Sequence, residues 1–185
     1  MTHSSERNYA LLGLIAPIIA IVFIALSILW SPWFSWGTNA LSDLGHSGHS
    51  AVAPLFNFGL LLSGFLMIVY AVTSFNSYAK YTSYFLVLAG LALQMVATFN
   101  EVYRPLHFLV SVLFFASLGL ASISYIIEKR SVLTVVALIV GAASWILYGL
   151  NVYTAGIAVP EIVSSMVTVM WVTLSAVRIY FNKRA

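Results

Sequence analysis

Three histidines and three carboxylates stand where they could do chemistry, at or near the ends of long apolar segments. The candidate metal ligands among them are Asp43, His46, His49 and His107. Imidazole and carboxylate groups are ligands that Zn²⁺ prefers, and a catalytic zinc ion keeps one position open for water. Glu101 or Glu161 could then act as the general base. The candidate catalytic residues are Asp43, His107, Glu101 and Glu161. This set of residues is typical of a metal-assisted hydrolase or transferase.

Most of these residues also have a purely structural interpretation. His46 and His49 are three apart in a stretch of Ser and Gly, where histidines are often no more than solvated polar residues. Asp43 could bond to backbone amides and hold its own loop in place. Glu101 and Arg104 are spaced to form a local ion pair, although Arg104 could also hold a phosphate headgroup. The sequence therefore leaves the cofactor open, with Zn²⁺ as the metal that the ligand types favour.

The elements that must position these residues are membrane helices. Hydrophobic residues make up 62% of the chain and charged residues 7%, and the mean hydropathy is +1.00. Soluble domains carry about 25% charged residues, so this chain cannot cover a water-facing surface. A bilayer requires about 20 apolar residues per helix. The predicted spans are residues 9–30, 55–75, 82–99, 106–127, 132–153 and 161–181. The fold class is therefore all-α, a six-helix bundle forming one membrane domain over residues 9–181.

The basic residues predict the orientation of this bundle. Arg104 falls on one side of the six spans, and the other seven Lys and Arg residues fall on the opposite side. The positive-inside rule then predicts that both termini are cytoplasmic, with tails at 1–8 and 182–185 and a long outer loop at 31–54. We expect a multi-pass protein of the plasma membrane. The net charge of +3 comes from residues scattered near span ends, which does not favour nucleic-acid binding. The absence of cysteine excludes disulfides and thiolate metal sites.

Polar residues at helical spacing gather toward the outer ends of the spans. Gln94 and Glu101 share a face at the end of the third span, as do Tyr148 and Asn151 in the fifth. His107 and Ser111, four residues apart, share a face at the start of the fourth span. The stripe in the sixth span consists of Glu161, Ser164, Ser165 and Thr168. Polar groups in hydrocarbon are costly unless they face a partner or a water-filled cavity. The sequence thus predicts an outward-facing polar pocket roofed by the 31–54 loop, unless these groups only bond within and between helices. The candidate ligand-contacting residues are Arg104, Gln94, Asn39, Ser111, Tyr148 and Asn151.

Three segments resemble a known membrane family. They are NALSDLG (residues 39–45), APLFNFGLLLSG (53–64) and NEVYRPLHFLVSVLFF (100–115). The chain is similar over most of its length, about residues 10–181, to the family catalogued as domain of unknown function 998. It departs from the family at Asn100-Glu101, where a Pro-acid pair is common, so the resemblance assigns no role to Glu101. The resemblance implies the fold and a membrane location, and it implies no mechanism.

The sequence supports three kinds of function. The first is an enzyme, a hydrolase or transferase that acts on a lipid or another amphiphile at the outer leaflet. The second is a non-catalytic protein that binds or transports a small molecule or lipid, although no internal repeat of the kind common in transporters is evident. The third is a membrane scaffold whose glycines allow close helix packing. The sequence does not determine the ligand or the oligomeric state.

Overall fold

The computed structural model describes residues 3–181, with side chains from residue 7 onward. The described residues form helices and connecting loops, with no strand among them. The elements are α1 (His3–Ala10), α2 (Leu12–Leu29), η1 (Leu41–Gly45), α3 (Ala53–Tyr70), η2 (Ala71–Phe75), α4 (Asn76–Tyr78), α5 (Lys80–Thr98), η3 (Glu101–Tyr103), α6 (Leu106–Lys129), α7 (Val132–Gly149) and α8 (Ala158–Phe181). The predicted tail at 182–185 lies outside the described residues.

Six of these helical stretches are long and apolar enough to cross a membrane, which confirms the predicted six-span bundle. They cover Arg7–Leu29, Ala53–Tyr78, Lys80–Thr98, Leu106–Lys129, Val132–Gly149 and Ala158–Phe181. The fifth helix is shorter than predicted because the chain turns after Gly149, where Asn151 has a left-handed backbone with φ 53°. The sixth helix begins before Glu161 because Pro160 lies in its first turn, where a missing N–H costs nothing.

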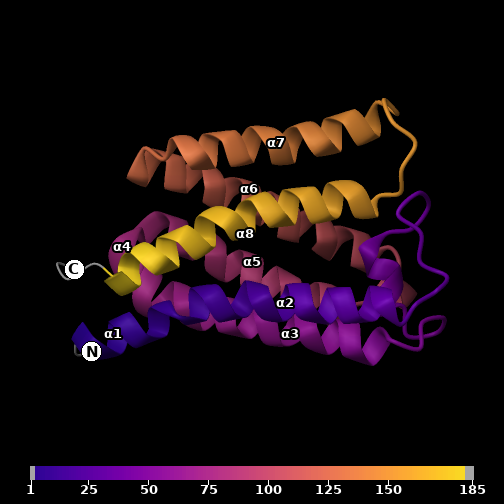
Figure 1. The fold of residues 1–185 in the computed structure, drawn as a ribbon, viewed down its shortest axis with the longest axis horizontal. Coiled ribbons are helices and arrows are strands. Elements are labelled where there is room, and N and C mark those ends of the chain that lie inside the picture. Colours follow the sequence, from indigo (N-terminus) through magenta and orange to yellow (C-terminus); the bar gives the residue numbers. More distant parts are fainter. Residues whose placement is uncertain (1–2, 182–185) are drawn as a thin grey trace.

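The six spanning helices form a closed ring. Along the chain, α2 packs on α3, α3 on α5, α5 on α6, α6 on α7 and α7 on α8, and α8 returns to pack on α2. Figure 1 shows α2 beside α3 on one side of the bundle and α7 at the opposite side, with α8 between them in this view. Helices α6 and α8 touch each other only sparingly. The ring therefore has an interior, which is either filled by side chains or contains a cavity.

Glycines set the closest approach within the ring. A Cβ atom added at Gly64 on α3 would lie 2.7 Å from the carbonyl oxygen of Gly90 on α5. Membrane helices lack a hydrophobic force that draws them together, so they depend on small residues for van der Waals contact between backbones. The Gly64–Gly90 contact explains why α3 and α5 pack tightly.

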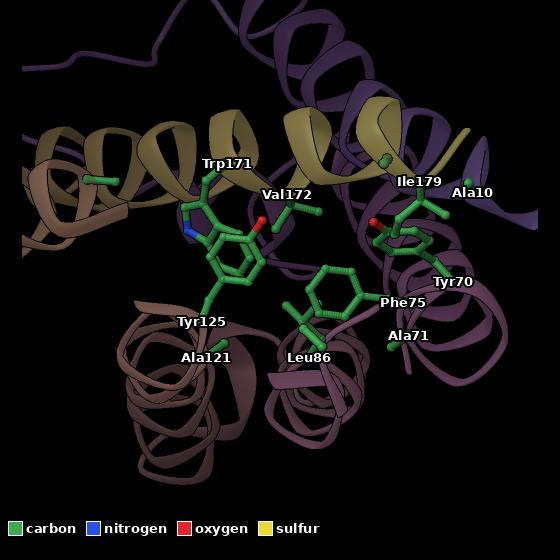
Figure 2. Close-up of a cluster of buried hydrophobic side chains, with 13 residues drawn as sticks. Ala10, Tyr70, Ala71, Phe75, Leu86, Ala121, Tyr125, Trp171, Val172 and Ile179 are labelled. Carbon is green, nitrogen blue, oxygen red and sulfur yellow. The ribbon is translucent and has the colours of Figure 1, made fainter. Parts of the chain in front are cut away.

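Both chain termini lie at one end of the bundle, which we call the terminal end (Figure 1). Here aromatic side chains from three elements fill the ring. Trp171 of α8 stacks on Tyr125 of α6 with ring centroids 4.7 Å apart, and Phe75 of η2 lies 6.0 Å from Tyr125. Figure 2 shows these rings meeting between the helices together with Tyr70 and Val172. The terminal end is therefore a packed core.

The opposite end carries the long connection between α2 and α3, and we call it the loop end. Residues 31–52 of this connection fold back over the ring, and we call this segment the lid. Within it, Leu44 of η1 is fully buried and packs in a cluster with Phe56 and Leu60 of α3. The backbone of the α7–α8 connection also bonds to the lid, with Gly156 N donating to the Trp36 carbonyl oxygen at 2.8 Å. The lid is thus part of the folded bundle.

Candidate functional site

A hydrogen-bonded network at the loop end is centred on Glu101, which lies in η3 between α5 and α6. Its Oε1 accepts a hydrogen bond from Ser42 Oγ of the lid at 2.8 Å. Its Oε2 forms an ion pair with Arg104 Nε at 2.7 Å. The Glu101 side chain is nearly buried, whereas that of Arg104 is 73% exposed. Glu101 therefore connects the lid to the start of α6, and Arg104 covers it from the solvent side.

His107, in the first turn of α6, extends this network into the ring. The residue is 5% exposed. Its Nδ1 lies 2.8 Å from the carbonyl oxygen of Phe99, and its Nε2 lies 3.4 Å from both Glu101 Oε1 and Ser111 Oγ. The carbonyl can only accept a hydrogen bond, so Nδ1 must carry a proton. Ser111 follows His107 by four residues, and this spacing places both on one helix face, as the sequence predicts.

Two further carboxylates hold the lid. Asp43 Oδ2 accepts from the Asn39 side-chain amide and from the Ala40 backbone N–H, both at 2.9 Å, and so closes the start of η1. Glu161, in the first turn of α8, accepts a hydrogen bond from the Leu41 backbone N–H through Oε2 at 2.7 Å. The Asp43 contacts agree with its structural interpretation, and the Glu161 contact ties η1 to α8.

Beneath η1 lies a cavity of about 120 Å³, which we call the chamber. All of α2, α3, α5, α6 and α8 contribute to its wall, and Leu41 and Ser42 of η1 form part of its loop end. Its lining is mostly apolar, with Phe114 and Ile162 among the side chains, and Ser111 and Glu161 are among the few polar groups. The sequence predicts a polar pocket, but the network residues bond to one another and to the lid, which leaves an apolar space below them.

A second cavity of about 190 Å³ lies between α6, α7 and α8. Phe115, Leu118 and Thr168 line both this cavity and the chamber. The two spaces are therefore neighbours, divided at the sparse contact between α6 and α8. A flexible apolar chain that fills the chamber has adjoining space into which it could extend.

The environment of Glu101 controls its ionisation. Burial raises the pKa of this carboxyl, but hydrogen bonds from Arg104 and Ser42 and a charge on the His107 ring together bring the pKa below its ordinary value of 4.5. A carboxyl whose pKa is lowered by folding stabilises the folded state above its ordinary pKa. That contribution is lost as the pH falls through the pKa of the folded state.

We expect Glu101→Gln to flatten the dependence of stability on acid. At neutral pH the variant should be less stable by about 1–2 kcal/mol, because Arg104 and His107 lose a charged partner and Arg104 is largely solvated. Between about pH 7 and pH 3 its unfolding temperature should then fall less than that of the wild type. Thermal unfolding in detergent across this pH range measures both effects. Equal acid sensitivity in the two proteins would contradict the assignment of a lowered pKa to Glu101.

Residues 14–178 match the family described as a protein of unknown function, DUF998. The match covers most of the chain. The chain belongs to the DUF998 family. Neither the curated proteins nor the solved structures gave a significant match.

The segments that carry the resemblance to DUF998 meet at the site. NALSDLG forms η1 and the residues before it, and NEVYRPLH forms η3 and the start of α6. These two segments join through the Ser42–Glu101 hydrogen bond. In this member of DUF998 the motifs build the lid, its contact with η3 and one wall of the chamber.

The structure does not assemble the predicted metal centre. Within residues 3–181, no group of three or more His, Asp and Glu side chains could hold a metal ion. His46 and His49 lie in the lid with ring centroids 4.4 Å apart, and His46 Nδ1 accepts a hydrogen bond from Gly48 N. His107 is buried in the ring, and Asp43 closes η1. The four predicted ligands therefore do not form one site among the described residues.

Five of the six predicted ligand-contacting residues lie outside the chamber lining. Arg104 is one of them, because its side chain is exposed and pairs with Glu101. Gln94 donates a long hydrogen bond of 3.4 Å to the Leu61 carbonyl and packs between α5 and α3. The Asn39 amide bonds to Ser35 N and Asp43 within the lid. Tyr148 and Asn151 lie at the end of α7 and just beyond it, and neither lines the chamber.

Sequence reasoning did not single out Ser42, which lines the chamber. Ser42 precedes Asp43 in a short 3₁₀-helix, and a single serine in such a segment carries no periodic signal. Ser165 also lines the chamber, and it falls on the polar stripe that helical spacing from Glu161 predicts in the last span. The Phe99 carbonyl that orients His107 is a backbone group, and no residue type could have indicated it.

Proposed function

We propose that this membrane protein binds an amphiphile at its loop end, with the apolar chain in the chamber and the polar head at Glu161 and Ser42. The observation that supports this most directly is an apolar cavity inside the helix ring with a carboxylate at its edge. An apolar cavity of about 150 Å³ in another protein stays dry and binds benzene. A chamber of about 120 Å³ therefore suits several carbon atoms of a chain.

The carboxylates indicate the chemistry of the head. Only one oxygen of Glu161, Oε2, takes the hydrogen bond from Leu41 N. A carboxylate accepts hydrogen bonds and donates none, so its other oxygen suits a hydroxyl, amine or ammonium group. The loop end carries Asp43, Glu101 and Glu161 against one guanidinium, that of Arg104, and Arg104 is paired with Glu101. An anionic head would face this excess of negative charge, so we infer a neutral or cationic donor.

The chain and the head contribute differently to binding. A lipid tail in the bilayer is already surrounded by hydrocarbon, so its transfer into the chamber gains little hydrophobic free energy. A hydrogen bond to a charged group contributes about 1.5–3 kcal/mol, which exceeds a tenfold change in affinity. The head therefore determines affinity, and the chamber determines which chain shapes fit. The amphiphile approaches from the leaflet at the loop end, which the positive-inside rule predicts to be the outer one.

Binding of dodecanol, dodecylamine and dodecanoate to the protein in lipid nanodiscs tests this proposal. We expect the alcohol and the amine to bind and the carboxylate to bind at least about tenfold more weakly. Ser165→Phe should lower the affinity for both, because its ring occupies the chamber, and Glu161→Gln should weaken the amine most. Ala116→Phe adds the same ring on an exposed part of α6 and should leave binding unchanged. Equal binding of all three probes, or no effect of Ser165→Phe, would overturn the proposal.

A further inference from the structure

We propose that Ser111 and His107 form a nucleophile and general base that cleave a carboxylic ester of an amphiphile bound in the chamber. This inference rests on the proposed binding function and adds a reaction to it. Ser111 lines the chamber, beside the space that a bound chain would occupy. Its partner His107 stands one helical turn away, between Ser111 and the Glu101 network.

The hydroxyl of Ser111 differs in its partner from that of Ser117 on the same helix. Ser117, also on α6, donates to the backbone carbonyl of Leu113 at 2.6 Å. This is the common hydrogen bond of a serine hydroxyl in a membrane helix. Ser111 Oγ lies instead 3.4 Å from His107 Nε2. This separation is at the long end for a nucleophile and its base, and such contacts commonly tighten when substrate binds.

The hydrogen bonds of His107 determine which nitrogen can act as a base. The proton on Nδ1 is directed to the Phe99 carbonyl at 2.8 Å, so in the neutral ring Nε2 has a free lone pair. That lone pair faces Ser111 Oγ. Glu101 Oε1 lies 3.4 Å from the same nitrogen, so its negative charge stabilises the imidazolium that forms when His107 takes a proton. The backbone therefore fixes the tautomer, and Glu101 supports the charged state.

The reaction balances with water as the second reactant. Ser111 Oγ bonds to the ester carbonyl carbon while its proton passes to His107 Nε2. The carbon–oxygen bond to the alcohol portion breaks, and the leaving oxygen takes the proton from Nε2. Water then attacks the acyl-serine with His107 again as base, which releases a carboxylic acid and restores the Ser111 hydroxyl. The substrate class is a long-chain carboxylic ester whose head donates a hydrogen bond to Glu161.

Labelling with an alkyl fluorophosphonate, which reacts covalently with activated serines, tests the pair in the purified full-length protein. We expect peptide mass spectrometry to find the label on Ser111 and to find none there in Ser111→Ala. His107→Gln should slow labelling at least about 100-fold, as loss of a general base does. Ser117→Ala removes a buried serine from the same helix and should leave labelling unchanged. Hydrolysis of p-nitrophenyl dodecanoate should follow the same order among these proteins.

Binding of dodecanol, measured on the same samples, separates the two proposals. A wild-type protein that binds dodecanol but takes no label at Ser111 would overturn the catalytic pair and leave the binding function standing. Labelling of His107→Gln at the wild-type rate would also overturn the pair, because Ser111 would then need no base. A wild-type protein that shows neither binding nor labelling would overturn both proposals. Dodecanol binding by Ser111→Ala confirms that the variant is folded.

Discussion

Replacing Trp171 by Ala should lower the free energy of unfolding by about 3 kcal/mol. Trp171 is 1% exposed and stacks on Tyr125 at the centre of the terminal end (Figure 2). Removal of a buried Trp side chain costs about 3–5 kcal/mol in soluble proteins, through lost contacts and the cavity that remains. The lower end of that range applies here because hydrocarbon, and not water, surrounds the separated helices. Thermal or SDS-induced unfolding in a mild detergent measures the change.

Trp30→Ala is the matched control for this substitution. Trp30 is 61% exposed at the C-terminal end of α2, so the same truncation removes few internal contacts. We expect its effect to stay within about 0.5 kcal/mol, as for most surface substitutions. If the two variants were equally stable, the terminal end could not be the part of the ring that carries the packing energy.

The helices could be predicted from the sequence because the bilayer leaves few choices. Apolar runs as long as those of this chain must form helices, since hydrocarbon offers no partners for an exposed backbone. The predicted helix boundaries were wrong where a local feature of the sequence, such as a proline or a turn residue, conflicted with the hydropathy pattern. Polar Glu161 was expected to begin the last span, but the helix starts at Ala158 because Pro160 suits a first turn. Tyr153 was expected within the fifth span, but the turn at Asn151 ends that helix earlier.

The site was predicted in part. Helical spacing placed His107 and Ser111 on one face, and the structure brings them together beside Glu101. The partner of Glu161 could not be predicted, because it is a backbone amide of the lid. The Leu41–Glu161 hydrogen bond joins residues 120 positions apart. A single sequence carries no information about which helices pair, so it could not show that α8 closes the ring against α2 and the lid.

The predicted metal ligands lie in separate local structures for a related reason. Spacing along the chain predicts which side chains lie close together only in a regular helix or strand. His46 and His49 instead occupy a turn of the lid. The His46 ring nitrogen is already used by Gly48 N in that turn. The histidine that sequence spacing placed on a helix, His107, is the one that the structure joins to other polar side chains. In this chain helical periodicity was a better guide to a site than residue type alone.

The two ends of the bundle differ in how their interiors are filled. Large rings occupy the terminal end (Figure 2), whereas a cavity of about 120 Å³ begins below η1 and extends along the ring as far as Val172. A binding site requires space that side chains would otherwise fill, and this lowers stability. The packed terminal end can offset that loss and stabilise a ring that contains a cavity. The lid supplies apolar packing at the loop end, since Leu44 is fully buried against α3. Movement of the lid would therefore control access to the chamber.

Gly156→Ala should open the lid. A Cβ atom at Gly156 would lie 2.7 Å from Asn39 N, and its nearest neighbours are all backbone atoms of the lid. Backbone atoms cannot move away by a rotamer change as a flexible side chain can, so the α7–α8 connection and the lid must separate. The hydrogen bonds Gly156 N to Trp36 O and Ala158 N to Asn39 O would then be lost or weakened. Two such bonds together contribute about 2 kcal/mol, which raises the open fraction at least about tenfold.

The absence of native cysteine makes this opening measurable. In Ser165→Cys the thiol lines the chamber, and its rate of modification by a water-soluble maleimide reports access from the loop end. We expect Gly156→Ala to raise that rate at least about tenfold. Gly37→Ala is the matched control within the lid, because a Cβ atom there meets only Ser35 Oγ at an ordinary 3.5 Å. If Gly156→Ala left the rate unchanged, the chamber would have another opening, and the adjoining cavity between α6, α7 and α8 marks where that opening would lie.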